Sequence, residues 1–500
     1  MDAFIEGLKL VFDPYVLMVM FISGAYGISI GAIPGLTATM AVALLIPLTF
    51  AMDAIPAMGA IVTTSAMAIF AGDLPGALLR IPGTPASGAY TDDAYNLTRQ
   101  GKAELALGVG VVMSAVGGIV GSIVLVLAAP ALAEVALNFS TYEYFWLSCL
   151  GLTCAAVMSN DAPLKGAISM ILGLALTTIG VDVLTGQPRF TFGSTEMLSG
   201  IGIIPALIGI FAVAEILRIC SAQRKSPPAL QGTVGNIFKD VWGTFRKYWL
   251  QFLRGNFIGI GVGALPGAGS DIGAWITYAV CKKFSKTPEK FGKGHVEGIV
   301  EATAANNSGL AAEWIPAMVF GIPGSTITAM VIGVLIMKDM QPGPTVFIYS
   351  PELIYGTFIT FFVANFLMII FGFFAIKGFK HILKIPPEVL MPTILMFCII
   401  GSFSMNNSGF GIVVMLILGL FSYILEENGF PTAPMVLAMV LGEILEQNFL
   451  TSMIKSHGNP VDFFSRPIAG TFGVLTILIW VLPLIRWLKE RRKPVAELID

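Results

Sequence analysis

The chain is poor in charged residues. Only 12% of its 500 residues are Asp, Glu, Lys or Arg, whereas about a quarter are charged in an ordinary soluble protein. Its 29 basic and 31 acidic residues leave a net charge of −2, so there is no basic excess to attract nucleic acid. The 55% of hydrophobic residues is also too high for a disordered chain. A soluble enzyme, a nucleic-acid binder and a disordered protein are therefore excluded.

Residues that usually build metal and redox sites are also scarce. The three histidines lie far apart, and none of the five cysteines forms a CxxC pair. We expect no metal site, and we interpret the cysteines as small buried apolar residues. The sequence also lacks the GxxxxGK[ST], HExxH and GxSxG motifs of ATPases, zinc proteases and serine hydrolases. These absences predict a protein that is not an enzyme and holds no cofactor.

What the chain does contain is long hydrophobic runs. A membrane-spanning helix needs roughly 20 mostly apolar residues, and several runs approach that length. The composition therefore predicts an all-α polytopic membrane protein. The candidate spans are Leu105–Pro130, Tyr144–Met158, Leu164–Val181, Met197–Ile219, Trp314–Met337, Leu353–Ile376, Val389–Phe403, Gly409–Leu425, Pro434–Leu445 and Gly470–Trp487.

Two further apolar stretches, Tyr15–Ala51 and Asn256–Cys281, are interrupted by Pro-Gly near their middles. Proline removes a backbone donor and glycine loosens the turn. Freed backbone groups are tolerated at membrane depth only where they are buried in protein or line a cavity. These stretches therefore predict re-entrant hairpins.

The interruptions recur in the same order in both halves of the chain. Gly31–Gly35 (GAIPG) matches Gly263–Gly267 (GALPG) 232 residues later, and Arg80–Thr84 (RIPGT) matches Gly321–Ser325 (GIPGS) 241 residues later. Paired Gly/Pro-interrupted segments in two halves point to a transporter site. We expect an N-terminal interfacial segment, two membrane repeats, a cytoplasmic linker between them, and a C-terminal helix with a basic cytoplasmic tail. The interfacial segment is residues 1–14, the two repeats are residues 15–220 and 246–455, the linker is residues 221–245, and the C-terminal helix and tail are residues 456–500.

Basic clusters indicate that the two repeats are inverted. Lys and Arg concentrate in cytoplasmic loops, which places Arg218–Arg254, Lys282–Lys293, Lys377–Lys384 and Arg486–Lys493 inside. The first-half positions that match Lys282–Lys293 and Lys377–Lys384 hold Asp53 and Glu134, respectively, and no basic residue. We expect about five spans plus one re-entrant hairpin in each repeat, with one extra C-terminal helix. Residues 55–71 leave the count open, because this apolar stretch could form an additional span.

The interruptions are accompanied by hydroxyl side chains. A helix that restarts after Pro-Gly exposes unpaired amides and a positive dipole end, which bind anions such as carboxylates. Four such ends meeting at mid-membrane would form an anion site, although any single Pro-Gly could also be a packing kink. The predicted substrate-binding residues at these ends are Pro34, Gly35, Thr37, Thr39, Pro82, Gly83, Thr84, Ser87, Pro266, Gly267, Ser270, Pro323, Gly324, Ser325 and Thr326.

Four other polar residues lie close to the interruptions. Arg80 precedes Ile-Pro-Gly in an apolar run, so it could contact a substrate carboxylate as a bidentate fork. It could equally form a salt bridge with Asp73 or Asp53, or reach the membrane surface. Asp271 and the pair Asn306 and Asn307 are candidates for coupling-ion or substrate contacts, or for helix caps and interhelical hydrogen bonds.

Several longer motifs resemble the large membrane subunit of tripartite tricarboxylate transporters (TctA-type). Beyond the four interruptions, the resemblance rests on Arg99–Ala103, Ser285–Lys293, Ala305–Asn307, Gln341–Pro344 and Gly429–Leu437, and it covers nearly the whole chain. It implies a bacterial inner-membrane secondary transporter that imports a tricarboxylate or related carboxylate with sodium or protons. It also implies a small four-helix membrane subunit and a periplasmic solute-binding protein as partners.

The charge pattern departs from that family near the interruptions, at Asp73, Arg80 and Asp271, which leaves the carboxylate undetermined. Two other functions stay open. An integral membrane enzyme acting on a lipid or isoprenoid would need an acidic motif for magnesium, and the adjacent Asp92 and Asp93 come nearest to one. A passive anion channel is the other alternative.

Overall fold

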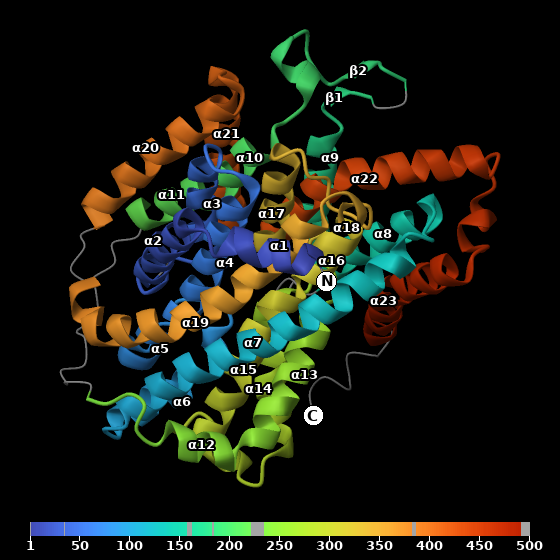
Figure 1. The fold of residues 1–500 in the computed structure, drawn as a ribbon. Helices are drawn as coiled ribbons and strands as arrows, with labels where there is room; N and C mark the ends of the chain where they lie inside the picture. The colour runs from blue at the N-terminus through green and yellow to red at the C-terminus, as the bar shows by residue number, and fades with distance from the viewer. Residues whose placement is uncertain are drawn as a thin grey trace.

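The fold is known from a computed structural model that describes residues 2–34, 36–157, 163–182, 185–221, 235–382 and 387–491. Within these residues the chain is almost entirely helical, as Figure 1 shows. The only strands among them, β1 (Gly180–Val181) and β2 (Pro188–Arg189), pair antiparallel in a small hairpin that projects from the helices. The predicted all-α class is confirmed.

The first half of the chain alternates long helices with short ones. In chain order its α-helices are α1 (Asp2–Val11), α2 (Pro14–Gly31), α3 (Ala38–Thr49), α4 (Ala54–Ala71), α5 (Asp73–Leu79), α6 (Thr91–Arg99), α7 (Ala103–Ala136), α8 (Thr141–Val157), α9 (Pro163–Thr177), α10 (Ile203–Leu207) and α11 (Ala214–Ser221). Single 3-10 turns lie at Ser87–Ala89 and Glu196–Ser199, and a π-helical segment, Ile208–Val213, joins α10 to α11.

The second half repeats this alternation. Its α-helices are α12 (Val241–Lys247), α13 (Trp249–Gly263), α14 (Gly269–Phe284), α15 (Val296–Ala312), α16 (Trp314–Phe320), α17 (Thr326–Met337), α18 (Val346–Tyr349), α19 (Pro351–Ile382), α20 (Pro387–Asn406), α21 (Gly409–Glu427), α22 (Ala433–Lys455) and α23 (Pro467–Arg491). Two further 3-10 turns, Pro288–Lys290 and Pro460–Phe464, lie in its loops.

Seven helical stretches within the described residues are long and apolar enough to span a membrane, so the protein is a multi-pass membrane protein. Their outer faces expose large apolar side chains such as Leu127 and Phe366, which a lipid environment tolerates and water does not. These stretches are Pro14–Gly31, Ala54–Leu79, Ala103–Ala136, Ile203–Ser221, Pro351–Phe379, Gly409–Glu427 and Ala433–Lys455.

Three predicted spans differ from the observed helices. The span 164–181 ends early, at Thr177, because Gly180 takes a positive φ and begins the β hairpin. The span 197–219 starts only at Ile203, after a separate 3-10 turn. The span 314–337 is two helices, since the chain turns at Gly321 before α17 begins.

The stretch 55–71, whose assignment was open, forms α4 in the interior. Nearly all of α4 is buried, and it packs against α2 and α19. Its counterpart in the second half is α15, which is buried between α7, α13 and α14. Protein therefore shields the polar side chains of α15, including Glu301 and Asn306, from lipid. This burial explains how a helix too polar to face lipid can cross the middle of the molecule.

The two halves contain matching elements in the same order. The pairs α2–α3 and α13–α14 are helical hairpins, α4–α5 and α15–α16 are bent helices, and the long helices α7 and α19 follow. Packing follows the same pattern, since α7 lies on α15 as α19 lies on α4. Outside this core, α8, α9 and α22 pack together, and α21 packs on α10 and α11 (Figure 1). The orientation of the halves across a membrane stays a prediction.

Candidate functional site

The four Pro-Gly interruptions form turns between helices, which we call tip 1 (residues 32–34 and 36–37), tip 2 (80–87), tip 3 (264–268) and tip 4 (321–325). Tips 2 and 4 end their preceding helices in the same way. α5 ends at Arg80 and α16 ends at Gly321, and both residues adopt the left-handed conformation. In each tip the next amide donates to a proline carbonyl six residues earlier, at 3.3 Å in tip 2 and 3.2 Å in tip 4. The turn is therefore a repeated feature of the backbone.

Tips 2 and 4 also start their following turns alike. In tip 2 the amides of Thr84 and Ser87 each donate to the other residue's hydroxyl, both at 3.2 Å. In tip 4 the amides of Ser325 and Thr328 do the same at 2.8 and 3.3 Å. Such a capping box satisfies two of the amides that a new helix leaves unpaired. At the start of α17 the other first-turn amides keep their capacity to bind an anion, whereas in tip 2 the Ala86 amide already donates to Asp271 and Pro85 has no N–H.

Tips 1 and 3 belong to the helical hairpins. The Thr37 side chain caps α3 by accepting from the amide of Met40 at 3.2 Å. In tip 3, Gly267 has a φ of +77°, and its amide donates to the carbonyl of Pro323 in tip 4 at 3.2 Å. A Cβ at Gly267 would lie 2.5 Å from the carbonyl oxygen of Gly151 in α8. Only glycine fits this turn, because both its backbone conformation and its contact exclude a side chain.

Residues next to all four tips line one cavity of about 330 Å³. This volume suits a small organic molecule. The starts of α3, α14 and α17 reach it, and Thr39 and Thr326 lie 3.3 Å apart between their hydroxyl oxygens, which joins tip 1 to tip 4. The predicted residues that line the cavity are Thr37, Thr39, Thr84, Gly267, Ser270, Asp271, Ser325 and Thr326.

The other predicted residues support the turns or lie apart from the cavity. Gly83 and Gly324 pack their backbones against residues 72 and 313, Ser87 caps tip 2, and Pro266 lies beside Gly151. The side-chain oxygens of Asn306 and Asn307 are buried in α15 without a hydrogen-bond partner among the described residues. Neither these residues nor Pro34, Pro82 and Pro323 line the cavity, and Gly35 lies outside the described residues.

Arg80 does not reach the cavity. Because Arg80 ends α5 in the left-handed conformation, its side chain turns to the surface, where it is 61% exposed. There its Nε lies 2.8 Å from Asp92. The salt-bridge partner of Arg80 is thus Asp92, and neither Asp73 nor Asp53, while its contact with a substrate carboxylate stays a prediction. Asp73 instead accepts a hydrogen bond from the Tyr90 hydroxyl at 2.6 Å.

Two carboxylates, one fully buried and one partly buried, connect the tips beside the cavity. Glu313, at the corner between α15 and α16, is fully buried and accepts from the Ser325 hydroxyl at 2.8 Å and from the Ser270 amide at 3.2 Å. Asp271, in the first turn of α14, accepts from the Ala86 amide at 3.2 Å. Within the described residues, neither carboxylate has an ion pair with a basic side chain. The cavity thus has two carboxyl groups close to the helix-start amides of its tips.

A second set of charged residues, from α11 and α21, also lines the cavity. Arg218 of α11 forms ion pairs with Glu215 one turn earlier and, at 3.6 Å, with Glu426 of α21. The Thr432 hydroxyl donates to the other oxygen of Glu426 at 2.8 Å. The guanidinium is therefore occupied by two carboxylates, and the charged lining of the cavity is predominantly acidic.

Sequence reasoning did not assign Glu215, Arg218, Glu313 or Glu426 to the site. Arg218 was counted only as part of a basic cytoplasmic stretch, and its partner Glu426 lies more than 200 residues away in the sequence. For Glu313 a signal was present, because the 241-residue offset that aligns tips 2 and 4 matches it to Gly72. A carboxylate that replaces a glycine beside one tip is a visible departure from the repeat.

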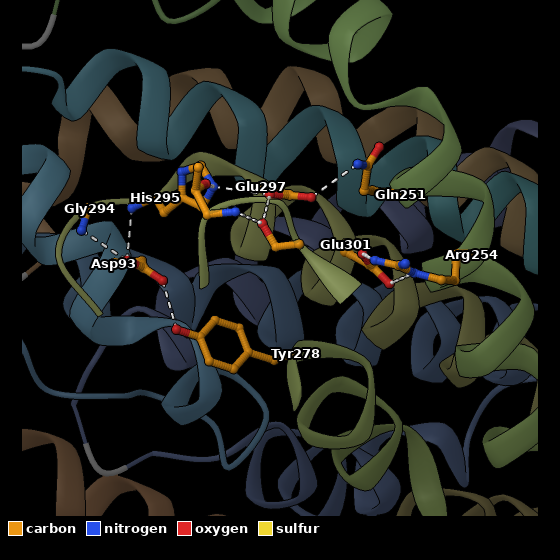
Figure 2. A network of polar contacts seen from close by, with 10 residues as sticks. Asp93, Gln251, Arg254, Tyr278, Gly294, His295, Glu297 and Glu301 are labelled. Carbon is orange, nitrogen blue, oxygen red and sulfur yellow. Dashed lines mark hydrogen bonds and ion pairs between the residues drawn. The ribbon is translucent and has the colours of Figure 1, made fainter. Parts of the chain in front are cut away.

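In the adjacent acidic pair, Asp92 lies at the surface and Asp93 has a structural position. Asp93 is fully buried and accepts from the amides of Gly294 and His295, at 2.9 and 2.8 Å, and from the Tyr278 hydroxyl at 2.7 Å. Figure 2 shows Gly294 and His295, from the loop between α14 and α15, and Tyr278, from α14, converging on Asp93. In the same network Glu297 accepts from Gln251, and Glu301 pairs with Arg254 (Figure 2). Asp93 therefore joins α6 of the first half to the second half.

The sequence matches the model of the tripartite tricarboxylate transporter TctA family over residues 17–437, which is most of the chain. The chain belongs to the TctA family. The family indicates the large subunit of a tripartite tricarboxylate transporter, and it is a family of transporters. The resemblance of the sequence motifs to this family is thereby confirmed, and the four tips of this TctA-family protein lie well inside the matched range.

Two relatives of this TctA-family protein come from Agrobacterium vitis. One, an uncharacterised 52.8 kDa protein in the TAR-I ttuC' 3' region, is 31% identical over 491 residues, which covers 97% of each chain. The other, an uncharacterised protein in the TAR-II ttuC' 3' region, is 33% identical over 228 residues, which covers 45% of this chain and 94% of the relative. No solved structure matches the chain.

Proposed function

We infer that this TctA-family protein moves a small organic carboxylate across the bacterial inner membrane, driven by a gradient of sodium or protons. One observation carries this proposal: helix starts from both halves of the chain line the same cavity, and those of α3 and α17 carry hydroxyl caps. Amides and dipoles at helix starts bind carboxylates. Discontinuous helices from two repeats enclose the substrate in many secondary transporters.

The acidic lining supports coupling to a cation. A substrate anion beside Asp271 and Glu313 meets two like charges inside protein, where charges interact more strongly than in water. A cation or proton that enters together with the anion removes this repulsion. Coupling through Asp271, which lines the cavity, is part of this proposal. A coupling role for Asn306 and Asn307 stays a prediction, because they lie in α15 behind the cavity.

The proposal includes an inverted arrangement of residues 15–220 and 246–455 in the membrane. The paired hairpins, bent helices and long helices of the two halves support it. A small four-helix membrane subunit and a periplasmic solute-binding protein are the proposed partners, on the strength of family membership. The binding protein would deliver the carboxylate to one side of the cavity, and movement between the tips and α11, α21 and α22 would open the other side.

Uptake of a labelled carboxylate into proteoliposomes that contain the protein with its partner subunits tests this function. Uptake should saturate and depend on an imposed sodium or proton gradient. Thr39→Val and Thr326→Val remove hydroxyls from the cavity and should weaken apparent affinity, whereas Thr471→Val on exposed α23 should not. Flux that ignores both gradients would reject coupling, and flux that never saturates would indicate a channel.

A further inference from the structure

Glu313 holds the donors that a carboxylate substrate would need. Its two oxygens accept from the Ser325 hydroxyl and the Ser270 amide, which belong to the starts of α17 and α14. Both donors line the cavity, and both belong to the helix starts that the proposed function assigns to the substrate. While Glu313 is ionised, it therefore occupies the anion position itself, and a substrate carboxylate must compete with it.

The charges around Glu313 leave this carboxylate without a cationic partner. The charged side chains that share its cavity are Asp271 from α14, Glu215 and Arg218 from α11, and Glu426 from α21. Arg218 is paired with both glutamates of its own wall. In the described part of the chain, α13, α15, α16, α17, α4 and α7 add no further charged side chain to the lining. Asp73, which is hydrogen-bonded to Tyr90, does not line this cavity.

We propose that Glu313 is the proton-carrying residue of this transporter, and that protonation of its carboxyl group hands the Ser325 and Ser270 donors to the carboxylate of the substrate. A proton from the medium joins one oxygen of Glu313 as the substrate binds. The neutral carboxylic acid is a weaker acceptor than the ion and does not repel the substrate. When the substrate leaves on the opposite side, the proton dissociates and Glu313 takes its two donors back.

The geometry favours a proton over a sodium ion at this position. A hard metal cation needs several oxygen ligands directed at it together. Both oxygens of Glu313 face an N–H or O–H hydrogen instead, which would repel a metal cation from the same space. A proton needs only one lone pair, so it can bind Glu313 without rebuilding the surroundings.

The equivalent position in the first half supports a specific role for this side chain. Gly72 ends α4 with nearly the same backbone angles as Glu313 ends α15, and Gly83 packs on it as Gly324 packs on Glu313. The turn therefore forms without a carboxylate. Because glycine suffices for the architecture, the carboxylate at 313 adds chemistry to one half only.

The test rests on the proposed carboxylate transport and uses the protein with its partner subunits in proteoliposomes. A panel of citrate, succinate and glutarate identifies a carboxylate that the wild type takes up, and that probe is used throughout. The wild type should accumulate it under a pH gradient without sodium. Its apparent affinity should weaken by about tenfold per pH unit once the solution is alkaline enough to ionise Glu313, because one protonation is linked to binding.

Glu313→Gln replaces the carboxyl group by a neutral amide of the same size. We expect this variant to exchange the probe in counterflow but to lose accumulation under a pH gradient, and its affinity should no longer depend on pH. Asp92→Asn, which makes the same chemical change at an exposed position outside the cavity, should behave as the wild type. Accumulation by Glu313→Gln with the wild-type pH profile, or accumulation by the wild type only with sodium, would overturn the proposal.

A direct measurement keeps the proposal testable if Glu313→Gln does not fold. Binding of the probe to the detergent-solubilised wild type in weak buffer should take up a proton, seen as an alkaline shift of a pH indicator. Probe binding without proton uptake would overturn the proton-carrying role while leaving carboxylate transport intact. If the wild type moves no member of the panel, carboxylate transport itself fails, and this inference fails with it.

Discussion

Tips 2 and 4 have the same backbone and different side chains. Both end a short helix in the left-handed conformation, and both begin the next turn with a reciprocal pair of hydroxyl caps. Around this common turn, Gly72 and Asp73 of the first half correspond to Glu313 and Trp314 of the second. The turn is thus an architectural feature of the repeat, and chemistry has been added to it separately in each half.

The segments that follow the two tips differ in the same manner. The polar helix α6 docks on the loop between α14 and α15 through Asp93, Asn96 and Gln100. The apolar helix α17 ends at Lys338, whose ammonium group donates to the carbonyls of Phe50 and Met52 in the loop between α3 and α4. Each half therefore forms hydrogen bonds with a loop of the other half. Three side chains make the contact with the α14–α15 loop, whereas one side chain, Lys338, makes the contact with the α3–α4 loop. Two contacts of unequal strength suit a transporter whose two sides open in turn.

The largest loss of stability should come from replacing the glycine that occupies the same position in tips 2 and 4, Gly83 and Gly324. A Cβ at Gly83 would lie 2.6 Å from the Cα of Gly72, and a Cβ at Gly324 would lie 2.7 Å from the Cβ of Glu313. Because backbone stands in the way, Gly83→Ala and Gly324→Ala should each lower stability by about 1–3 kcal/mol or more. Apparent melting temperature in detergent measures this, and uptake should fall with it.

Gly261→Ala in α13 is the matched control for this pair, because nothing lies within 4 Å of a Cβ there. Alanine in a helix should leave the melting temperature unchanged or raise it slightly. If Gly83→Ala and Gly324→Ala differ widely in stability, the two turns are not equivalent and the comparison is broken.

Asp93→Asn should cause the next largest loss of stability, because it weakens the contact between α6 and the α14–α15 loop, the stronger of the two contacts that join the halves. Asp93 accepts three hydrogen bonds in a fully buried position, and an amide in its place turns an N–H group toward at least one donor. Hydrogen bonds to a charged group contribute about 1.5–3 kcal/mol, so a loss of this order is expected. The exposed neighbour in Asp92→Asn should cost far less. Equal melting temperatures for the two variants would contradict the structural role of Asp93.

Sequence reasoning could find the tips because their signals are local. Pro-Gly with a following Thr or Ser specifies a broken helix and its cap within a few residues, which is why Thr37 and Ser325 cap their helices as the pattern indicates. The two-half order of these signals also indicated that the elements would match. Their binding role stays a prediction, since geometry alone does not test it.

The charged groups could not be placed in this way because their environment is non-local. Arg80 lies in an apolar run, but its direction depends on the left-handed turn that ends α5. The matching residue is Gly321, and a glycine at that offset was the available signal for such a turn. Arg218 meets Glu426 only because α11 packs on α21, a contact between distant parts of the chain.

Lys338→Met should weaken the contact with the α3–α4 loop. The loss of stability should be smaller than the loss that Asp93→Asn causes at the α14–α15 loop. Its ammonium group donates to two carbonyls, but the side chain is only partly buried and water can replace it. We expect a loss of about 1 kcal/mol in stability. We would compare the melting temperatures of Lys338→Met, Asp93→Asn and the double variant. The two losses of stability should add, because the two sites are far apart. A larger loss of stability from Lys338→Met than from Asp93→Asn would show that the contact with the α3–α4 loop is the stronger of the two.

The smallest effects should come from Arg80, where the two halves differ without consequence for the cavity. Arg80→Gln breaks an exposed ion pair with Asp92 and should change stability by about 0–1 kcal/mol, with no change in the apparent affinity for substrate. Arg80→Gly makes the first turn like the second. Since a non-glycine residue in the left-handed conformation costs about 1–2 kcal/mol, this change should offset the lost ion pair or exceed it. An affinity loss in Arg80→Gln would instead show that Arg80 acts on the substrate, and the comparison of the tips would then have to include this side chain.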